Sequence, residues 1–288
     1  MYFCGNNLRK QVNGVGMHIQ IRNNVRVAGE GPATLVFVHG FGCDQTMWRY
    51  LEPQFRQHYR TVLFDLVGSG QSDLAAYDTR RYATLDGYAD DLRAVVASVA
   101  DATGGPVVCI SHSVSAMTGL LASIAAPELF AAQVMLAPSP CYIDEPATGY
   151  RGGFTRADID DLLSAMDSNY LGWAGTLAPA IMGAPGQPAL GEDLTRSFCR
   201  TDPAIARHFA QATFLSDHRA ILPRNTTPAL IVQCSDDFIA PRPVGDYLHA
   251  MLPCSSLQVV ENIGHCPHMS APDASYRAIR HFLDGLHL

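Results

Sequence analysis

The sequence predicts an α/β fold in which a mostly parallel central sheet has helices on both faces and a helical insertion interrupts the chain. Apolar stretches typical of buried strands alternate with amphipathic, helix-like stretches over residues 17–140, and the alternation resumes at residue 218. Strands that are apolar throughout are typical of parallel sheets covered on both faces. We therefore expect a core of residues 17–140 and 218–288, a helical lid of residues 141–217, and an N-terminal tail of residues 1–16.

The expected strands come first. Ile19, Ile21, Val25 and Val27 alternate as they would in a hairpin, or in an edge strand and its return. Six further strands are expected at residues 34–38, 60–65, 106–111, 131–137, 227–234 and 256–261.

Helices are expected between these strands. Asp44 and Gln45 cap and start one after the first buried strand. Residues 82–100 carry apolar side chains on one face, residues 113–126 form a helix rich in small residues, and a last helix follows Asp273.

The insertion has two clear helix starts. Thr155 and Asp158 have the spacing of a capping box, in which each side chain satisfies a backbone N–H of the first turn. Asp202 is an N-cap residue followed by Pro203 in the first turn, and it opens a helix that runs through Phe214.

Composition excludes several classes of function. The 288 residues carry 20 Lys and Arg against 27 Asp and Glu, a net charge of −7 without a basic run, so we expect neither a nucleic-acid partner nor a membrane surface. Lys10 is the single lysine, which excludes Schiff-base chemistry within the folded body. The eight cysteines form no C-x-x-C pair and no stretch is apolar enough to span a bilayer, so we expect a cytoplasmic protein with reduced thiols.

A candidate nucleophile lies between a buried strand and a helix, in Ser111-His112-Ser113-Val114-Ser115. A strained strand-to-helix turn of this kind exposes a serine hydroxyl over the sheet, with small residues two positions before and after the nucleophile. We interpret Ser113 as the nucleophile and Ser111 and Ser115 as small residues that leave room for the backbones.

A candidate acid and a candidate base follow later strands. Asp237 comes at the end of the strand at 227–234 in a D-x-x-x-P pattern, which favours it over the neighbouring Asp236. His265 follows the strand at 256–261. The order Ser113, Asp237, His265 is that of the α/β-hydrolase fold, in which serine attacks, histidine moves the proton and aspartate orients the imidazole.

The oxyanion hole of such a site needs two backbone N–H donors. In this fold they come from the residue after the nucleophile and from the loop after an early strand. Val114 and Phe41 occupy those positions, and glycines on both sides of Phe41 allow its loop to bend toward the serine.

The chain resembles the RsbQ-type α/β-hydrolases, a group that includes a bacterial stress-response regulator and, more distantly, the plant strigolactone and karrikin receptors. The resemblance covers residues 20–285 and is carried by these stretches, among others: HGFGCDQTMW, VLFDLVGSGQSDL, TLDGYADD, SPCY, NYLGWA, FCRTDPAIARHFA, FLSDHR, QCSDDFIAP and GHCPHMSAPD. By this resemblance Ser113, Asp237 and His265 match the family's catalytic triad, and Phe41 and Val114 match its oxyanion hole. Ser115 departs from the glycine usual in the family.

Other readings of the histidines are weaker. His265, Cys266 and His268 are too closely spaced on one loop, with no further ligand in register, to indicate zinc. We expect no metal and no cofactor, a packing role for His268, and a structural role for His112. A haloalkane dehalogenase would need an aspartate at position 113.

The expected function is a serine hydrolase that acts on a small, largely apolar ester, lactone or enol ether. Some aromatic side chains of the lid, with Phe41 and Phe238, are expected to line an apolar cavity above Ser113. The alternative is a ligand sensor with slow or single turnover that reports occupancy to a signalling protein partner through its lid, and cofactor-free perhydrolase activity is a lesser option.

Overall fold

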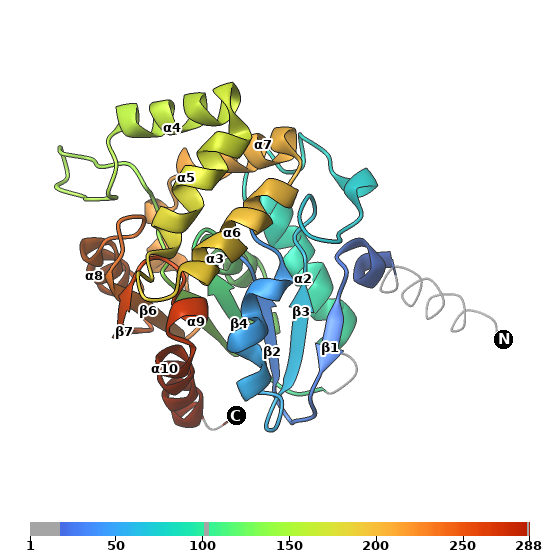
Figure 1. The fold of residues 1–288 in the computed structure, drawn as a ribbon. Helices are drawn as coiled ribbons and strands as arrows, with labels where there is room; N and C mark the ends of the chain where they lie inside the picture. Colours follow the sequence, from blue (N-terminus) through green and yellow to red (C-terminus); the bar gives the residue numbers. More distant parts are fainter. Residues whose placement is uncertain (1–17, 101–103, 287) are drawn as a thin grey trace.

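A seven-stranded sheet runs through the part of the chain that the computed structural model describes, residues 18–100, 104–286 and 288 (Figure 1). Its strands lie in the order β1-β3-β2-β4-β5-β6-β7; β1 is antiparallel to β3, and the other pairs are parallel. The strands are β1 (Arg26–Ala28), β2 (Thr34–Val38), β3 (Arg60–Phe64), β4 (Val107–His112), β5 (Ala132–Leu136), β6 (Ala229–Asp236) and β7 (Ser255–Ile263). The six predicted strands are confirmed at bounds close to those expected; β7, at the edge of the sheet, is only partly buried. The tail predicted at residues 1–16 lies outside the described residues.

Helices cover both faces of this sheet. Side chains alternate between the two faces along each strand, so both faces carry apolar side chains that helices bury. Leu35 and Phe37 of β2 face the cluster that contains the short 3₁₀-helix η1 (Gln45–Tyr50) and the last helix. Val36 and Val38 face the opposite cluster, which contains α2 (Asp86–Ala100), α3 (Ser115–Ala125) and α8 (Arg242–Met251). Helix α9 (Pro267–Ser270) and the last helix, α10 (Pro272–Gly285), belong to the first cluster.

The helical insertion lies between β5 and β6 and forms a layer above the carboxyl ends of the strands (Figure 1). It consists of α4 (Arg156–Ser168), α5 (Tyr170–Met182), α6 (Pro188–Arg200) and α7 (Pro203–Phe214). Both predicted caps are confirmed: Thr155 and Asp158 form a complete capping box, and Asp202 accepts hydrogen bonds from two backbone N–H groups of α7.

The expectation of purely helical structure across residues 141–217 is wrong for its first part. Residues 141–155 form an extended loop that pairs through isolated bridges, Ile143 with Phe154 and Glu145 with Tyr150. These bridges satisfy backbone groups of a segment that leaves the sheet before α4 begins.

The N-terminal expectation is also partly wrong. Residues 18–22 are helical, with Ile19 buried and Ile21 exposed, so the two isoleucines do not share the face of a strand. The backbone N–H of Asn23 closes this turn on the carbonyl of Ile19, and Asn24 ends it with a φ of 47°. Asparagine tolerates this left-handed conformation, which is a common way to end a helix. Only β1 remains to pair with β3 at the edge of the sheet.

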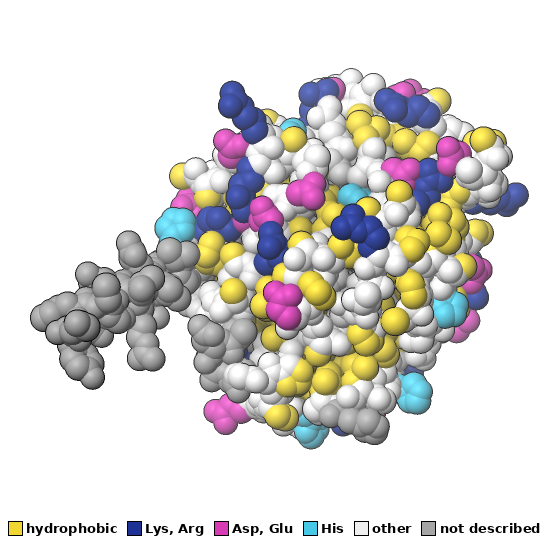
Figure 2. Space-filling model, turned by 180° about the vertical axis from the view of Figure 1, so that it is seen from behind, with side chains coloured by type: hydrophobic (Ala, Val, Ile, Leu, Met, Phe, Trp, Pro, Cys, Tyr) yellow, Lys and Arg dark blue, Asp and Glu magenta, His cyan; other side chains and the backbone are white. Residues whose placement is uncertain are grey.

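The surface carries charges of both signs. On the face shown in Figure 2, acidic and basic side chains are interspersed among the described residues. Within the described part of the chain, no helix combines the length and apolar character needed to cross a bilayer.

Candidate active site

Ser113 lies in a strained turn between β4 and α3. Its φ is 57°, a left-handed value that is rare for residues other than glycine and asparagine. Its backbone N–H donates to the carbonyl of Leu136 at the end of β5 (2.9 Å), so a neighbouring strand holds the turn in place. Strain held by the surrounding structure is typical of functional positions.

The serines that flank this turn do more than leave space for the backbones. Both are fully buried. The Ser111 hydroxyl donates to the carbonyl of Val134 (3.2 Å), and the Ser115 hydroxyl donates to the carbonyl of His39 (2.6 Å). Ser115 therefore ties the start of α3 to the end of β2, a contact that glycine cannot make.

Asp237 and His265 meet Ser113 above the carboxyl ends of the strands. Nε2 of His265 lies 2.7 Å from Oγ of Ser113, and Nδ1 of His265 lies 2.7 Å from Oδ2 of Asp237. The other oxygen of Asp237 accepts hydrogen bonds from the backbone N–H groups of Ile239 (2.9 Å) and Ala240 (3.2 Å). The carboxylate is buried and fully paired, and it can hold the imidazole with its proton on Nδ1. Asp236 is the exposed last residue of β6 and takes no part in this chain of hydrogen bonds.

Phe41 and Val114 both lie beside the nucleophile. Val114 directly follows Ser113 as the N-cap residue of α3, where helix N–H groups have no intrahelical acceptor. Phe41 lies in the loop after β2, and Gly40 of that loop packs against the His112 ring so closely that a Cβ there would lie 2.6 Å from Nδ1. Neither the Phe41 nor the Val114 backbone N–H donates to another backbone group of the described residues. Both groups are free to receive a developing negative charge.

Two further histidines lie behind His265. Nε2 of His112 lies 2.8 Å from the carbonyl oxygen of His265, to which it can donate. The His268 ring packs between His112 (4.5 Å between ring centroids) and Trp48 (4.6 Å). Burial lowers the pKa of His268 to about 3 and holds the pKa of His112 well below its ordinary value. Both imidazoles are neutral at physiological pH, so they pack around the base without adding charge to it.

An apolar cavity lies above Ser113. Its free volume is small, about 30 Å³. Besides Ser113 and His265, its lining consists of Phe41, Cys43, His112, Tyr142, Ile181, Leu194, Phe198, Thr213, Phe214, Ile239 and Cys266.

The lining of the cavity differs from the sequence prediction in two residues, Phe238 and Tyr142. Phe238 does not line it and is 45 % exposed, because the turn around Asp237 directs the next residue, Ile239, inward instead. Tyr142 was not predicted, and its hydroxyl lies 3.4 Å from Ser113 Oγ. Burial raises the pKa of Tyr142, so its phenol is neutral at physiological pH. Its place after β5, at the edge of the sheet where ligands bind, is the signal that could have indicated it.

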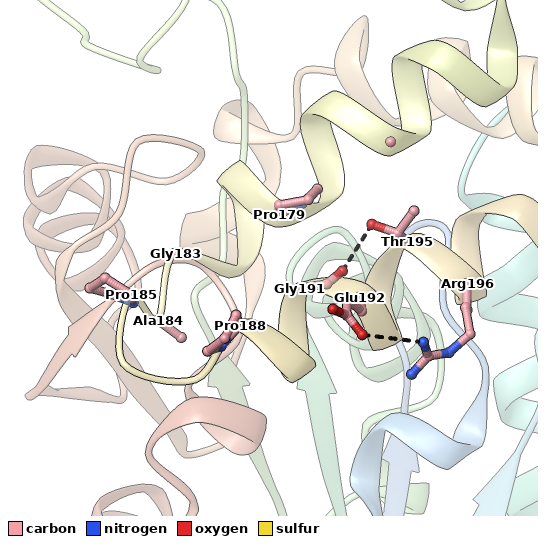
Figure 3. Close-up of a pocket in the computed structure, with 10 residues that line it drawn as sticks. Pro179, Gly183, Ala184, Pro185, Pro188, Gly191, Glu192, Thr195 and Arg196 are labelled. Atoms are coloured by element: carbon pink, nitrogen blue, oxygen red, sulfur yellow. Dashed lines mark hydrogen bonds and ion pairs between the residues drawn. The ribbon is translucent and has the colours of Figure 1, made fainter.

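Another hollow lies between α5 and α6 and the loop that joins them (Figure 3). It contains none of the triad residues, and its two charged side chains, Glu192 and Arg196, pair with each other. The candidate reaction site is therefore the cavity that holds Ser113. Across residues 18–100, 104–286 and 288, no three His, Cys, Asp or Glu side chains converge as metal ligands would.

Comparison with known proteins places this geometry in context. Residues 35–278 match the profile described as "Alpha/beta hydrolase family". The chain is 38 % identical to a karrikin insensitive 2 receptor of Petunia hybrida (88 % of this chain, 93 % of the relative) and 37 % identical to a strigolactone esterase of Arabidopsis thaliana (86 % and 91 %). Among solved structures, a hydrolase from Oleispira antarctica superposes with a TM-score of 0.88 at 40 % identity, covering 93 % of this chain and 97 % of that one.

The buried histidines predict how stability depends on pH. The unfolded chain protonates His268 below its ordinary pKa of about 6.5, whereas the folded protein keeps it neutral down to about pH 3. Stability is therefore lost as pH falls through this window, by about 1.4 kcal/mol per pH unit for one such residue. Between pH 6.5 and pH 5, we expect the free energy of unfolding of His268→Leu to fall by up to about 2 kcal/mol less than that of the wild type, as measured by urea unfolding.

The matched control is His58→Leu, which replaces an exposed histidine. Only the change in the free energy of unfolding between pH 6.5 and pH 5 is compared, because leucine also changes the packing against Trp48 at both pH values. An equal pH dependence in His268→Leu and the wild type would contradict this prediction.

Proposed function

The chain belongs to the alpha/beta hydrolase family and is an esterase-type member of it, and from this we propose that it hydrolyses a small, largely apolar ester or lactone through Ser113, His265 and Asp237. The observation that carries the proposal is the pair of 2.7 Å contacts that join the serine hydroxyl, the imidazole and the carboxylate. Within the family we propose membership of the RsbQ-type group, on the stretches quoted from the sequence.

In the proposed mechanism, Oγ of Ser113 attacks the carbonyl carbon of the substrate while its proton passes to Nε2 of His265. The carbonyl oxygen becomes an oxyanion, which the N–H groups of Phe41 and Val114 stabilise. The intermediate collapses to an acyl-enzyme as His265 returns the proton to the leaving oxygen. Water, deprotonated by His265, then releases the acid and restores the serine. Asp237 keeps the imidazole oriented and stabilises its positive charge throughout.

The substrate class follows from the cavity. Most of its lining side chains are aliphatic or aromatic, and none carries a permanent charge opposite Ser113, which favours an apolar ligand. The relative named a strigolactone esterase supports an ester or lactone substrate. Because the free volume above Ser113 is only about 30 Å³, we propose that residues 141–217 act as a lid that must move before a substrate enters.

A second candidate function is ligand sensing with slow turnover. It is supported by the relative named a karrikin insensitive 2 receptor and by the position of the lid directly over the cavity. A lid that rests on the ligand has a position that depends on occupancy, and a protein partner can read that position.

Ser113→Ala tests the nucleophile. We expect it to reduce hydrolysis of a chromogenic short-chain ester to background and to abolish labelling by a fluorophosphonate probe, because the attacking oxygen is lost. Far-ultraviolet circular dichroism should remain that of the wild type. Ester hydrolysis near the wild-type rate would place the nucleophile elsewhere.

The two neighbouring aspartates allow a matched test of the acid. We expect Asp237→Asn to lower kcat by up to about 10⁴-fold, as in a serine-protease triad whose histidine loses its tautomer. Asp236→Asn should leave kcat within about twofold, because that side chain is exposed and does not contact His265. The reverse ranking in steady-state kinetics would reassign the acid to Asp236.

Hydrogen exchange tests the lid. We expect amides of α4–α7 to exchange faster than those of β4 and β6, because the insertion must part from the core whereas the strands open only with the whole fold. A covalent serine inhibitor that fills the cavity should slow exchange in the insertion by adding contacts on both sides. Unchanged protection across the insertion would remove the basis for ligand sensing and leave an esterase without a mobile lid.

A further inference from the structure

The loop that carries Phe41 is anchored from two sides. We call residues 39–44 the oxyanion loop. On the core side, His39 accepts a hydrogen bond at its carbonyl from Ser115 (2.6 Å) and one at its ring Nε2 from the backbone N–H of Leu66 (3.0 Å). These contacts fix the beginning of the loop. Phe41, two residues later, is the residue whose N–H must point at the substrate.

On the other side, helix α6 of the insertion holds the second half of the loop. The Ser197 hydroxyl donates to the carbonyl of Gly42 (2.9 Å), and the Arg200 guanidinium pairs with the Asp44 carboxylate (2.9 Å). Ser197 and Arg200 are three positions apart, so they lie on the same face of α6. The pair Arg49 with Asp193 joins the same helix to η1, directly after the loop.

The backbone of Gly42 is shaped for this contact. Its φ of 68° is left-handed, and a Cβ at this position would lie 2.3 Å from the Phe198 ring of α6. A residue with a side chain would therefore push α6 away from the loop. Close approach between the helix and the loop explains why glycine occupies this position.

The Phe41 side chain also packs against the insertion. Its ring contacts four aromatic rings of α5, α6 and α7, at 5.6 to 6.3 Å between centroids. These rings are Trp173, Phe198, Phe209 and Phe214. The insertion thus contacts the loop at Phe41, Gly42 and Asp44 in succession.

We infer that Ser197 and Arg200 are positioning residues, which hold the oxyanion loop so that the N–H of Phe41 points toward the carbonyl oxygen at Ser113. The inference rests on the proposed function, because it assigns these residues a role in the same reaction. It follows that the oxyanion hole is complete only while α6 lies against the loop. A ligand that displaces α6 also weakens the hole.

These contacts matter more for rate than for stability. The Arg200 side chain is 59 % exposed, and ion pairs at such exposed positions add little to folding stability. Rate is more sensitive, because the loss of one oxyanion donor lowers kcat by about 10²-fold to 10³-fold. Burial would raise the pKa of Asp44, but hydrogen bonds from Thr46 and Arg200 outweigh it and lower the pKa, so the carboxylate stays charged at neutral pH.

The test combines Ser197→Ala with Arg200→Gln in one variant. We expect kcat for a chromogenic ester to fall about tenfold with KM changed less than twofold, because the loop contributes in the transition state rather than in the bound ground state. The inhibition constant of an aryl trifluoromethyl ketone, which forms a tetrahedral adduct with the serine, should rise by a similar factor. Deuterium uptake of a peptide covering residues 39–49 should increase in the free protein.

The matched control is Arg156→Gln. Arg156 lies on helix α4 of the same insertion with a side chain that is 66 % exposed, and it pairs with Asp160 of its own helix rather than with the loop or α6. It should leave all three measurements unchanged. Arg200→Lys with Ser197 retained should recover most of kcat, because lysine keeps the charge opposite Asp44.

Each outcome decides the inference. Unchanged deuterium uptake in the double variant would show that α6 does not hold the loop, whatever the rates. Increased uptake with unchanged kcat and unchanged ketone inhibition would show that the position of the oxyanion loop does not affect stabilisation of the oxyanion. A wild type that neither hydrolyses esters nor reacts with fluorophosphonate would overturn the proposed function and, with it, the catalytic role of Ser197 and Arg200. In that case the deuterium uptake of residues 39–49 would still decide whether α6 holds the loop.

Discussion

The parallel register of β4, β5 and β6 is the constraint on which the site depends. His112 pairs with Leu136, and Leu136 pairs with Val232, so these strands point the same way and lead into the same edge of the sheet. The chain leaves β4 at Ser113 and β6 at Asp237, and it leaves β7 at Gly264, one residue before His265. Residues far apart in the sequence therefore meet because backbone hydrogen bonds align the strands that carry them. A shift of one residue in this register would turn each side chain to the other face of the sheet.

Burial determines the chemical character of the candidate triad. A carboxylate removed from water is stable only when its oxygens are paired, and Asp237 meets this requirement with His265 and two backbone N–H groups. The same apolar surroundings strengthen every hydrogen bond aimed at developing charge. The neutral rings of His112 and His268 fill the space behind His265 without competing for its proton.

The insertion is part of the site as well as its cover. Helix α5 contributes the carbonyl of Ile181, which accepts a hydrogen bond from the backbone N–H of His265 (2.8 Å). Helix α6 contacts the oxyanion loop through Ser197 and Arg200. The backbones of His265 and of Gly42, the residue after Phe41, thus both form hydrogen bonds with the insertion. In the proposed lid movement, displacement of these helices would change the geometry around Ser113 as well as access to the cavity.

The sequence by itself determined the sheet strands, the caps at Thr155 and Asp202, and the residues that meet at the site, because local periodicity and the chain positions of Ser113, Asp237 and His265 already contain that information. It did not determine the helical turn at residues 18–22, the extended loop at 141–155, or the inward direction of Tyr142 and Ile239. Those features were decided by the tertiary structure. A side chain at the end of a strand or in a turn has no periodicity to follow, and its direction is set by neighbours that arrive from distant parts of the chain, such as Phe214 packing on Tyr142.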